Sequence, residues 1–275
     1  MKKDDFGDRM KAYEVIETKH RLDKAFPIYA RIDGRAFSKF TRGLQRPFDA
    51  RISRCMIETA KHLVAETNAD LGYTQSDEIS LAWLPKEDPL SEFLFGGKVQ
   101  KLCSVLSGMA TAKFMGMIMQ IAQEPGEEEF LKYASKLPHF DARIFCVPSV
   151  SEAANCFVWR EMDAIRNAVS MTAHSLYSPK KLHGKSTADK RIMIREAGVV
   201  FDAFPIHFRR GTFVRRVAKE TVLDVESLPE KAREHLGDDC VVIRKVVEEV
   251  EIPPLVNIAN KADVLFFGID PIFKE

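Results

Sequence analysis

Two adjacent carboxylates interrupt an otherwise extended and largely apolar stretch of the chain. Asp77 and Glu78 lie side by side within the segment GYTQSDEISLAW, residues 72–83, whose other residues predict a single strand. A buried carboxylate is unfavourable unless it is paired with a cation or bound to a metal. Side chains alternate between the two faces of a strand, so we expect these carboxylates to point to opposite faces. The sheet that this chain forms must therefore pair these carboxylates with a cation or bind a metal with them.

A second acidic position ends another predicted strand. The segment PIYARIDGRAF, residues 27–37, alternates as a strand does up to Asp33 and then turns at Gly34. If the two strands pair, Asp33 and Asp77 meet on one face and Glu78 is left on the other. Neighbouring carboxylates repel each other unless a cation lies between them, and oxygen ligands with few protein donors are typical of Mg²⁺. A plain Asp-Gly turn and a plain strand end at Ser-Asp-Glu are equally compatible with the spacing, which leaves the choice open.

The residues after Asp33 are suited to a phosphate. Beyond Gly34 the chain continues through small or polar residues, so backbone amides can face an anion. Basic residues nearby in the sequence would neutralise phosphate charge: Arg31, Lys39, Arg42, Arg46, Lys98 and Lys101. Combined with a metal site, this pattern predicts nucleotidyl or phosphoryl transfer.

The order of the predicted elements favours an α+β fold with one antiparallel sheet covered by helices. Hydrophobic periodicity predicts helices over 8–25, 47–68, 99–123 and 152–174, and a short helix within 183–198. Strands are predicted over 27–37, 72–83, 140–148, 204–222 and 240–255, the last two giving a strand-rich C-terminal extension. A polar insertion over 224–239 separates those two strands. Both tryptophans, Trp83 and Trp159, are expected in the core.

Net charge, hydropathy and cysteine content limit the kinds of partner and site that this protein can have. The net charge of the 275 residues is only +1, so any nucleic acid has to be held by a local basic patch. The charged N-terminus does not resemble a signal peptide and no apolar run reaches about 20 residues, so we expect no membrane partner. Five cysteines without a C-x-x-C pair argue against a zinc site or disulfides and fit the reducing cytoplasm.

Three specific strings of residues, RIDGRAFSKFT, PFD and YTQSDEISL, occur in this order along the chain. Together with weaker strings further along, they resemble the tRNA-His guanylyltransferase family, polymerases that add nucleotides in the 3′-to-5′ direction. Within the family, the likeness is to the bacterial and archaeal branch of guanylyltransferase-like proteins. It continues through FDARIFCVPS, FVWREMDAIRNA, HGKSTADK and FRRGT, and so covers roughly residues 5–215.

This resemblance implies a catalytic region over residues 1–140 that is shaped like the palm of ordinary polymerases. Residues 141–275 would belong to the same compact unit and contact RNA, nucleotide and the other subunits of a homotetramer. The resemblance further implies two Mg²⁺ ions held by Asp33, the Gly34 carbonyl and Asp77, with Asp33, Asp77 and Glu78 as the catalytic residues. The implied nucleotide-binding residues are Arg31, Arg35, Ala36, Phe37, Ser38, Ser76 and Lys101. The candidates for 5′-end activation or RNA contact are Arg46, Arg166, Asn167, Lys190, Arg209 and Arg210, although the last two could equally be solvated surface.

The implied reaction has two steps at the 5′ end of tRNA. ATP or GTP first activates a 5′-monophosphate, giving an adenylylated end when ATP is used. The 3′-hydroxyl of an incoming nucleoside triphosphate then attacks that end and, in the ATP case, releases AMP.

One departure from the family concerns the choice of substrate. Eukaryotic members carry H-I-N-N-L-Y-N after W-R-x-x-D, whereas here Ile165 stands at the His position and only Asn167 of the first Asn pair remains. This difference favours templated repair of a truncated 5′ end over non-templated G addition to tRNA-His. The residues are also compatible with a nucleotidyl cyclase, which likewise sets two metal-binding carboxylates on a palm-like sheet, and with a non-catalytic RNA-binding protein.

Overall fold

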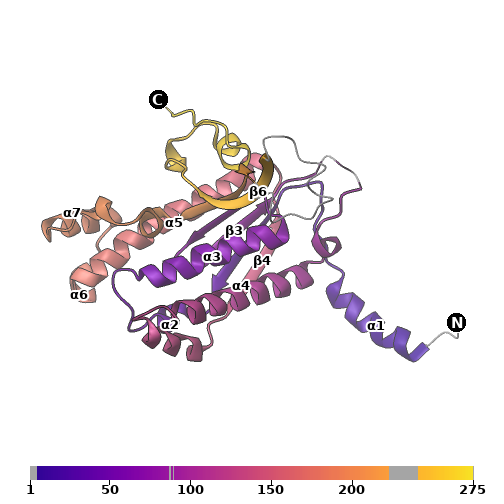
Figure 1. Ribbon diagram of the computed structural model, residues 1–275, viewed down its shortest axis with the longest axis horizontal. Coiled ribbons are helices and arrows are strands. Elements are labelled where there is room, and N and C mark those ends of the chain that lie inside the picture. The colour runs from indigo at the N-terminus through magenta and orange to yellow at the C-terminus, as the bar shows by residue number, and fades with distance from the viewer. Residues whose placement is uncertain (1–4, 87, 89, 223–240, 275) are drawn as a thin grey trace.

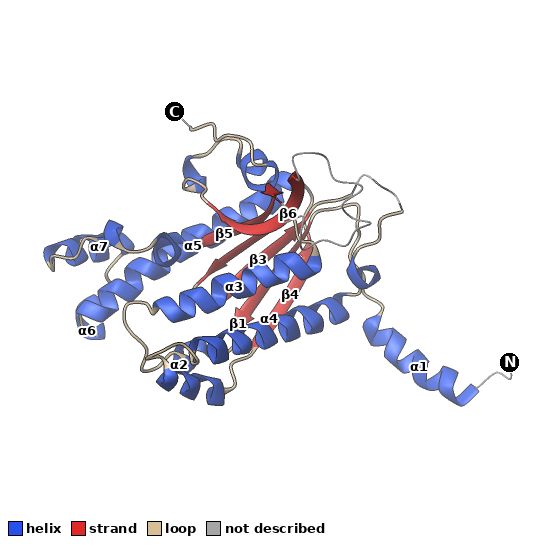
Figure 2. Ribbon diagram, viewed as in Figure 1, coloured by secondary structure: helices blue, strands red, loops and turns tan. Residues whose placement is uncertain are grey.

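The computed structural model describes residues 5–86, 88, 90–222 and 241–274, and its centre is an antiparallel sheet with helices on both faces (Figure 1 and Figure 2). The strand order across the sheet is β4-β1-β3-β2-β5-β6. The strands are β1 Ile28–Gly34, β2 Leu71–Gln75, β3 Glu78–Trp83, β4 Phe140–Cys146, β5 Thr212–Val222 and β6 Val241–Val250. The predicted α+β class with one antiparallel sheet is confirmed.

The helices match the predicted periodicity over most of the chain. The α-helices are α1 Asp5–Thr18, α2 Phe37–Phe40, α3 Ala50–Thr67, α4 Val99–Ile121, α5 Val150–Leu176, α6 Pro179–Leu182, α7 Thr187–Glu196 and α8 Ile206–Arg210. Short 3-10 helices occur at Leu94–Gly97, Glu128–Lys136, Phe201–Ala203 and Leu255–Asn257, and a π-helix at Asp263–Phe267. Asp49 caps the N-terminus of α3, because its side chain accepts a hydrogen bond from the Arg51 backbone N–H.

Alternation along β1 divides the core into two layers. Ile28, Ala30 and Ile32 lie on the side covered by α3 and α4, which are in front of the sheet in Figure 1. Tyr29 points to the other side and packs on Phe157 of α5, with ring centroids 5.1 Å apart. Asp33 has the parity of Tyr29 and therefore lies on the α5 side. The polar end of β1 is thus placed opposite the helix that carries the W-R-x-x-D sequence.

Two predicted strands are shorter than expected. The segment 204–222 begins as helix α8, and β5 starts only at Thr212, because Gly211 takes a positive φ of 83° and ends the helix. Arg209 and Arg210 are therefore helical residues. The segment 240–255 leaves the sheet after Val250, just before two consecutive prolines that cannot donate to a ladder. The polar insertion over 224–239 lies outside the described residues.

The two tryptophans occupy different environments. Trp83 is 4% exposed and its indole N–H donates to the Thr67 carbonyl, so its predicted place in the core is confirmed. Trp159 is 52% exposed, so the prediction for it is wrong. The reason is its position on α5. Residue 157 faces the sheet, and residue 159 is rotated about 200° from it around the helix axis.

Among the described residues, one helix is long and apolar enough, by length and composition alone, to cross a bilayer. This helix is α4. Its Leu106, Phe114 and Ile118 are buried in the core layer between α4 and the sheet. The apolar side of α4 therefore serves as packing surface in this fold, as the core helices of globular proteins do.

A buried ion pair holds the C-terminal segment against α5. Glu161 of α5 is fully buried and accepts hydrogen bonds from Arg210 Nη1 at 2.9 Å and from the Leu255 backbone N–H at 2.8 Å. Arg210 also donates to the Ile252 carbonyl. The guanidinium that the sequence offered for RNA contact is thus occupied inside the protein. The sheet takes strands from both sides of residue 140, and the division of the chain at that residue stays a prediction.

We expect Arg210→Met to lower the free energy of unfolding by about 3–5 kcal/mol, because Glu161 would be left buried without its cation. Urea denaturation followed by circular dichroism measures this change. Arg209→Met is the matched control on the same helix, and its more exposed ion pair with Asp202 predicts a change below about 1 kcal/mol. An Arg210→Met protein of unchanged stability and reduced RNA affinity would contradict this structural role.

Candidate active site

Asp77 lies in a tight turn and not inside a strand. Gln75 of β2 pairs with Glu78 of β3, so Ser76 and Asp77 are the two loop residues of a hairpin. Ser76 adopts a positive φ of 49°, and its hydroxyl donates to Asp77 Oδ1 at 3.0 Å. Two-residue hairpins are signalled most strongly by Asn-Gly or Asp-Gly, and Ser-Asp lacks that signal. For this reason the sequence predicted one continuous strand.

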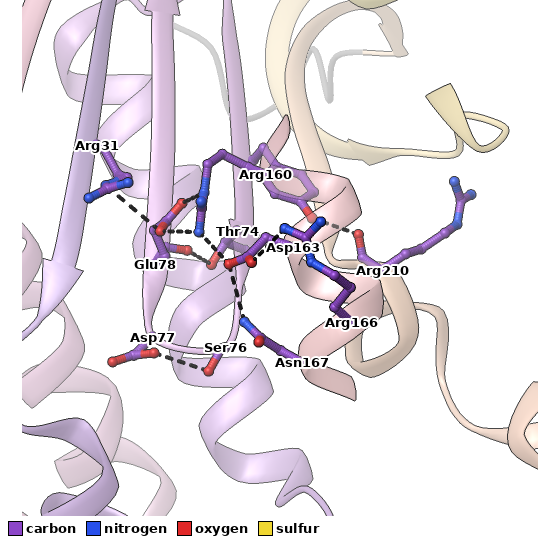
Figure 3. A network of polar contacts seen from close by, with 11 residues as sticks. Arg31, Thr74, Ser76, Asp77, Glu78, Arg160, Asp163, Arg166, Asn167 and Arg210 are labelled. Atoms are coloured by element: carbon purple, nitrogen blue, oxygen red, sulfur yellow. Dashed lines mark hydrogen bonds and ion pairs between the residues drawn. The ribbon is translucent and has the colours of Figure 1, made fainter. Parts of the chain in front are cut away.

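Glu78 lies on the same face as Asp33, which corrects the predicted arrangement. The two residues are direct partners in the β1–β3 ladder, and directly opposed residues of an antiparallel pair point to the same side. Glu78 is 5% exposed, and both of its carboxylate oxygens accept from Arg160, from Nε at 2.6 Å and from Nη2 at 2.8 Å. Burial raises the pKa of Glu78, and the Arg160 guanidinium opposes that rise. Glu78 is therefore the link between the sheet and α5 (Figure 3).

Asp77 is held beside the end of β1 that carries Asp33. The Gly34 backbone N–H donates to the Asp77 carbonyl at 3.0 Å, which fixes the turn against the end of β1. Burial and, next, the negative charge of Asp33 raise the pKa of Asp77 to about 6. The pKa of Asp33 is also raised, by burial and by the Asp141 carboxylate opposite it on β4. A carboxylate whose ionised form is destabilised by burial and by a neighbouring negative charge is a ready site for a cation.

The loop after Asp33 is shaped by two close approaches. A Cβ atom at Gly34 would lie 2.4 Å from Phe37 Cδ2 and 3.1 Å from Asp77 Cβ, so only glycine fits there. Ala36 takes a left-handed φ of 53° and begins the short helix α2. Phe37 is 7% exposed and packs on Phe114 with ring centroids 5.5 Å apart, which anchors the loop in the core. The Arg35 backbone N–H donates to the His139 carbonyl at 2.9 Å. The Nη1 atom of Arg35 lies 3.2 Å from Nε2 of the His139 ring. Arg35 is exposed.

A pocket of about 580 Å³ opens beside Asp77. Its walls come from the loop 41–49, the start of α3, the Ser76–Asp77 turn, α5 and α8. This volume is in the range of small-molecule sites. The polar or charged side chains on its wall are Ser38, Thr41, Gln45, Arg46, Asp49, Ser53, Gln75, Ser76, Asp77, Asn167, Ser170, His174 and His207. The predicted residues Ser38, Arg46, Ser76 and Asn167 thus meet Asp77 at one cavity.

Lys190 reaches this pocket from α7. Its Nζ donates to Ser170 Oγ at 3.1 Å, and Ser170 lines the cavity. Asp189 and Ser186 form a capping box at the start of α7, which fixes the helix that carries Lys190. The predicted place of Lys190 near a bound nucleotide or RNA end is compatible with this geometry.

Asp163 accepts hydrogen bonds from three other side chains of α5. The sequence analysis did not identify it as a site residue. Its Oδ2 accepts from Arg160 Nη2 at 2.8 Å and from Asn167 Nδ2 at 3.2 Å, and its Oδ1 accepts from Arg166 Nη2 at 3.0 Å (Figure 3). Burial acts to raise the pKa of Asp163, but the two guanidiniums outweigh it and hold that pKa below its usual range. The spacing of residues 160, 163, 166 and 167, three or four apart, was the available signal. It places them along one side of a helix.

His207 was also missed. It lies on α8, lines the pocket and contacts Thr212 Oγ1 through Nδ1 at 3.0 Å. Burial lowers its pKa to about 4, so the imidazole is neutral at pH 7. His207 directly precedes the FRRGT string, but a single histidine gives no spacing pattern by which to find it.

Lys101 does not lie at this site. It is in the first turn of α4 and its ammonium lies 4.8 Å from the centre of the Phe95 ring. The residue of α4 that lies near the end of β1 is Thr111. Its hydroxyl accepts a hydrogen bond from the backbone N–H of Phe140, and Phe140 is the ladder partner of Gly34. Ten residues of helix span about 15 Å, so within this chain Lys101 is too far away to contact a phosphate at Asp33. The sequence placed it on the correct helix but could not give the direction in which that helix crosses the sheet.

Comparison with known proteins gives the site its context. The sequence profile described as tRNA-His guanylyltransferase matches residues 7–148, more than half of the chain. The chain belongs to the tRNA-His guanylyltransferase family. Members of this family are nucleotidyltransferases, and this protein is therefore an enzyme of that class.

Solved structures and curated relatives agree with this assignment. A bacterial tRNA-His guanylyltransferase-like protein in complex with ATP has 33% identity and a TM-score of 0.68, over 76% of this chain and 88% of that one. A second bacterial structure of this kind, in complex with GTP, has 27% identity and a TM-score of 0.68, over 92% and 94% of the two chains. The tRNA-His guanylyltransferase of Neurospora crassa is 25% identical over 96% of this chain and 92% of its own. The palm-like fold that the resemblance implied is confirmed by the two bacterial structures.

The donor set at the turn fits Mg²⁺ and no softer metal. Among the described residues, no three or more His, Cys, Asp or Glu side chains gather as a metal-binding group. Two carboxylates and a nearby carbonyl are hard oxygen donors, and Mg²⁺ commonly takes its remaining ligands from water and substrate phosphates. Burial and, next, the charge of Asp33 raise the pKa of Asp77, and a cation bound there would oppose both effects.

We expect Asp77→Asn to stabilise the metal-free protein at pH 7.5 by about 1–2 kcal/mol. This free energy is smaller than the full pKa shift would give, because the carboxylate is partly exposed. The pKa of Asp77 is about 6 in the fold against an ordinary 3.8, so the folded state binds this proton more tightly. Stability should therefore fall as pH rises from about 4 to 6 and stay level above that range, and the variant should lack this dependence. Thermal unfolding in chelator across pH 4–8 measures both.

Added Mg²⁺ should then raise the melting temperature of the native protein and have little effect on Asp77→Asn. The control is Glu66→Gln, which changes an exposed carboxylate on α3 and should behave as the native protein does. Equal stability of native protein and Asp77→Asn in chelator at pH 7.5 would show that the carboxylates do not destabilise each other.

Proposed function

We propose that this protein adds nucleotides to the 5′ end of tRNA in the 3′-to-5′ direction, reading the opposite strand as template to restore truncated ends. The observation that carries the proposal is the position of Asp77, held against the end of β1 beside Asp33 and next to a pocket of about 580 Å³; burial and, next, the charge of Asp33 raise its pKa. Membership of a nucleotidyltransferase family supports the class of reaction. The finer assignment rests on the residues described below.

Asp33, Asp77 and the Gly34 carbonyl would hold two Mg²⁺ ions. When bound, Mg²⁺ polarises phosphate oxygens and lowers the pKa of the attacking hydroxyl. The chain itself fixes the donors. The Ser76 hydroxyl orients Asp77 Oδ1, and the Gly34–Asp77 backbone hydrogen bond holds the turn against β1. Glu78 does not compete for the cation, because Arg160 occupies both of its oxygens.

ATP and GTP are the proposed substrates of the pocket. Two bacterial relatives were solved in complex with ATP and with GTP. In this chain Ser38, Ser76 and Arg46 line the cavity near Asp77, where a triphosphate would lie, and Arg46 supplies positive charge. In the activation step, a 5′-phosphate oxygen of the RNA attacks the α-phosphorus of ATP and pyrophosphate leaves. In the addition step, the 3′-hydroxyl of the incoming nucleotide attacks the RNA 5′-phosphorus and AMP leaves.

Templated addition is proposed over addition of a fixed G because of α5. The residue at the position of the eukaryotic His is Ile165, which offers no hydrogen bond for fixed recognition of a base. Asn167 lines the pocket, but its side-chain amide donates a hydrogen bond to Asp163. With few dedicated base contacts on the protein, the choice of nucleotide would pass to base pairing with the opposite strand. Assembly as a homotetramer and a cytoplasmic location remain parts of this proposal.

The deciding experiment supplies purified protein with Mg²⁺, ATP, all four nucleotides and a 5′-truncated tRNA whose templating base is varied. We expect the added nucleotide to follow the template, and Asp77→Asn to reduce addition by at least about 100-fold, the order of loss on removing one electrostatic group of a transition state. Sequencing of the extended 5′ end gives the outcome.

Three results would overturn parts of the proposal. Addition of G whatever the template would return the function to tRNA-His maturation. Formation of a cyclic nucleotide without RNA would identify a cyclase. An unchanged rate in Asp77→Asn would reject the site itself.

A further inference from the structure

Trp159 is an exposed aromatic ring held beside the acidic site. It is 52% exposed although the guanidiniums of Arg160 and Arg31 lie 4.5 Å and 5.7 Å from its ring centre. Both arginines are tied to Glu78, Arg160 by two hydrogen bonds and Arg31 by an ion pair at 3.8 Å (Figure 3). Glu78 is the ladder partner of Asp33. The ring is therefore fixed at the level of the catalytic end of the sheet.

The strand next to this ring is open on the same face. β4 is the edge strand, and its residues Asp141, Arg143 and Phe145 are exposed. Arg143 is the ladder partner of Arg31, and Phe145 is the partner of Tyr29, which packs under α5. Met162, three residues after Trp159 on α5, is 42% exposed and Phe145 is 40% exposed. We call Arg31, Arg143, Phe145, Trp159 and Met162 together the Trp159 surface.

The Trp159 surface is distinct from the pocket beside Asp77. None of its five residues lines that pocket. The pocket takes residues 164, 167, 168, 170, 171 and 174 of α5, whereas the surface takes residues 159 and 162, and the Trp159 ring lies over Arg31 of β1. A nucleoside triphosphate in the pocket would leave this surface free. The two sites flank the same carboxylates.

The chemistry of the Trp159 surface is that of a base-stacking platform. Proteins that hold single-stranded RNA combine exposed aromatic rings with arginine, since every base has a π-face and a guanidinium stacks on it as well. The arginines here already have carboxylate partners: Arg31 with Glu78, Arg143 with Asp141 and Arg160 with Glu78. Their net field is therefore small, and recognition would rest on the ring face more than on phosphate charge.

We propose that the Trp159 surface binds an unpaired nucleobase of the RNA end on which the acidic site acts. Arg31 lies two residues before Asp33 on the same face of β1, a separation of about 7 Å along the strand. A base stacked on the ring would thus belong to a nucleotide next to the reacting phosphate. This inference rests on the proposed function for its substrate, but it assigns a separate binding site for that substrate.

Intrinsic fluorescence gives a direct test, because the protein has two tryptophans and Trp83 is buried. A short 5′-phosphorylated single-stranded RNA should quench the emission of the native protein, whereas ATP or GTP alone should not. Trp159→Phe should bind the RNA within about threefold of native affinity and show no quenching. Trp159→Ala should bind it about 5- to 150-fold more weakly, the range for loss of one stacked base.

The salt dependence separates stacking from charge. Trp159→Ala should lower RNA affinity equally at low and high salt, because no phosphate contact is removed. The binding of ATP should be unchanged, and the KM for truncated tRNA should rise while kcat at saturating RNA stays near the native value. Tyr13→Ala, which removes an aromatic ring 60% exposed on α1, is the matched control and should alter none of these.

Three outcomes would overturn the inference. The first is native RNA affinity and native KM in Trp159→Ala. The second is quenching by ATP or GTP without RNA, which would assign the ring to the free nucleotide. The third is protection of Trp159 from iodide in the protein without RNA, which would show that a second copy of the chain covers it. Failure of the proposed function would look different, since an active Asp77→Asn leaves RNA quenching in place.

Discussion

The ion pair between Glu78 and Arg160 joins the two halves of the site. Both carboxylate oxygens of Glu78 receive a hydrogen bond from the guanidinium, and both side chains are almost fully buried. Such a pair adds little net stability, because desolvation offsets much of the attraction, but loss of one partner is severe. Its value is positional. It sets α5, with Asp163, Asn167 and Trp159, at a fixed height over the end of the sheet that carries Asp33.

The helix α5 consequently contributes residues both to the pocket and to the exposed surface around Trp159. Residues such as Asn167 and Ser170 form a wall of the pocket, and residues such as Trp159 and Met162 are exposed outside it. Buried glutamates anchor the helix at two successive levels, Glu78 from the sheet and Glu161 through the C-terminal segment. A helix fixed in this way can hold a nucleotide and an RNA end in a constant relation to each other, which is what transfer between them requires.

The sequence predicted the parts of this protein that depend on local pattern. Alternation identified β1 and the amphipathic helices, and it placed Asp33 at the end of its strand. It did not predict the turn at Asp77, because Ser-Asp carries no hairpin signal, and so it put Glu78 on the wrong face. Lys101 and Arg210 were assigned by position in the chain, whereas their contacts depend on helix direction and burial. Those properties arise only when distant segments pack.

The hairpin at Ser76 and Asp77 restricts how this region can vary between related proteins. Its two loop residues join strands whose register brings Glu78 opposite Asp33 and under Arg160. An insertion or deletion of one residue after the turn would rotate every later side chain of β3 to the other face. The buried glutamate would then enter the apolar layer beneath α3 and α4, and Ile79 would face the arginines. The core on either side of the hairpin therefore tolerates replacement of side chains in the turn but opposes any change in its length.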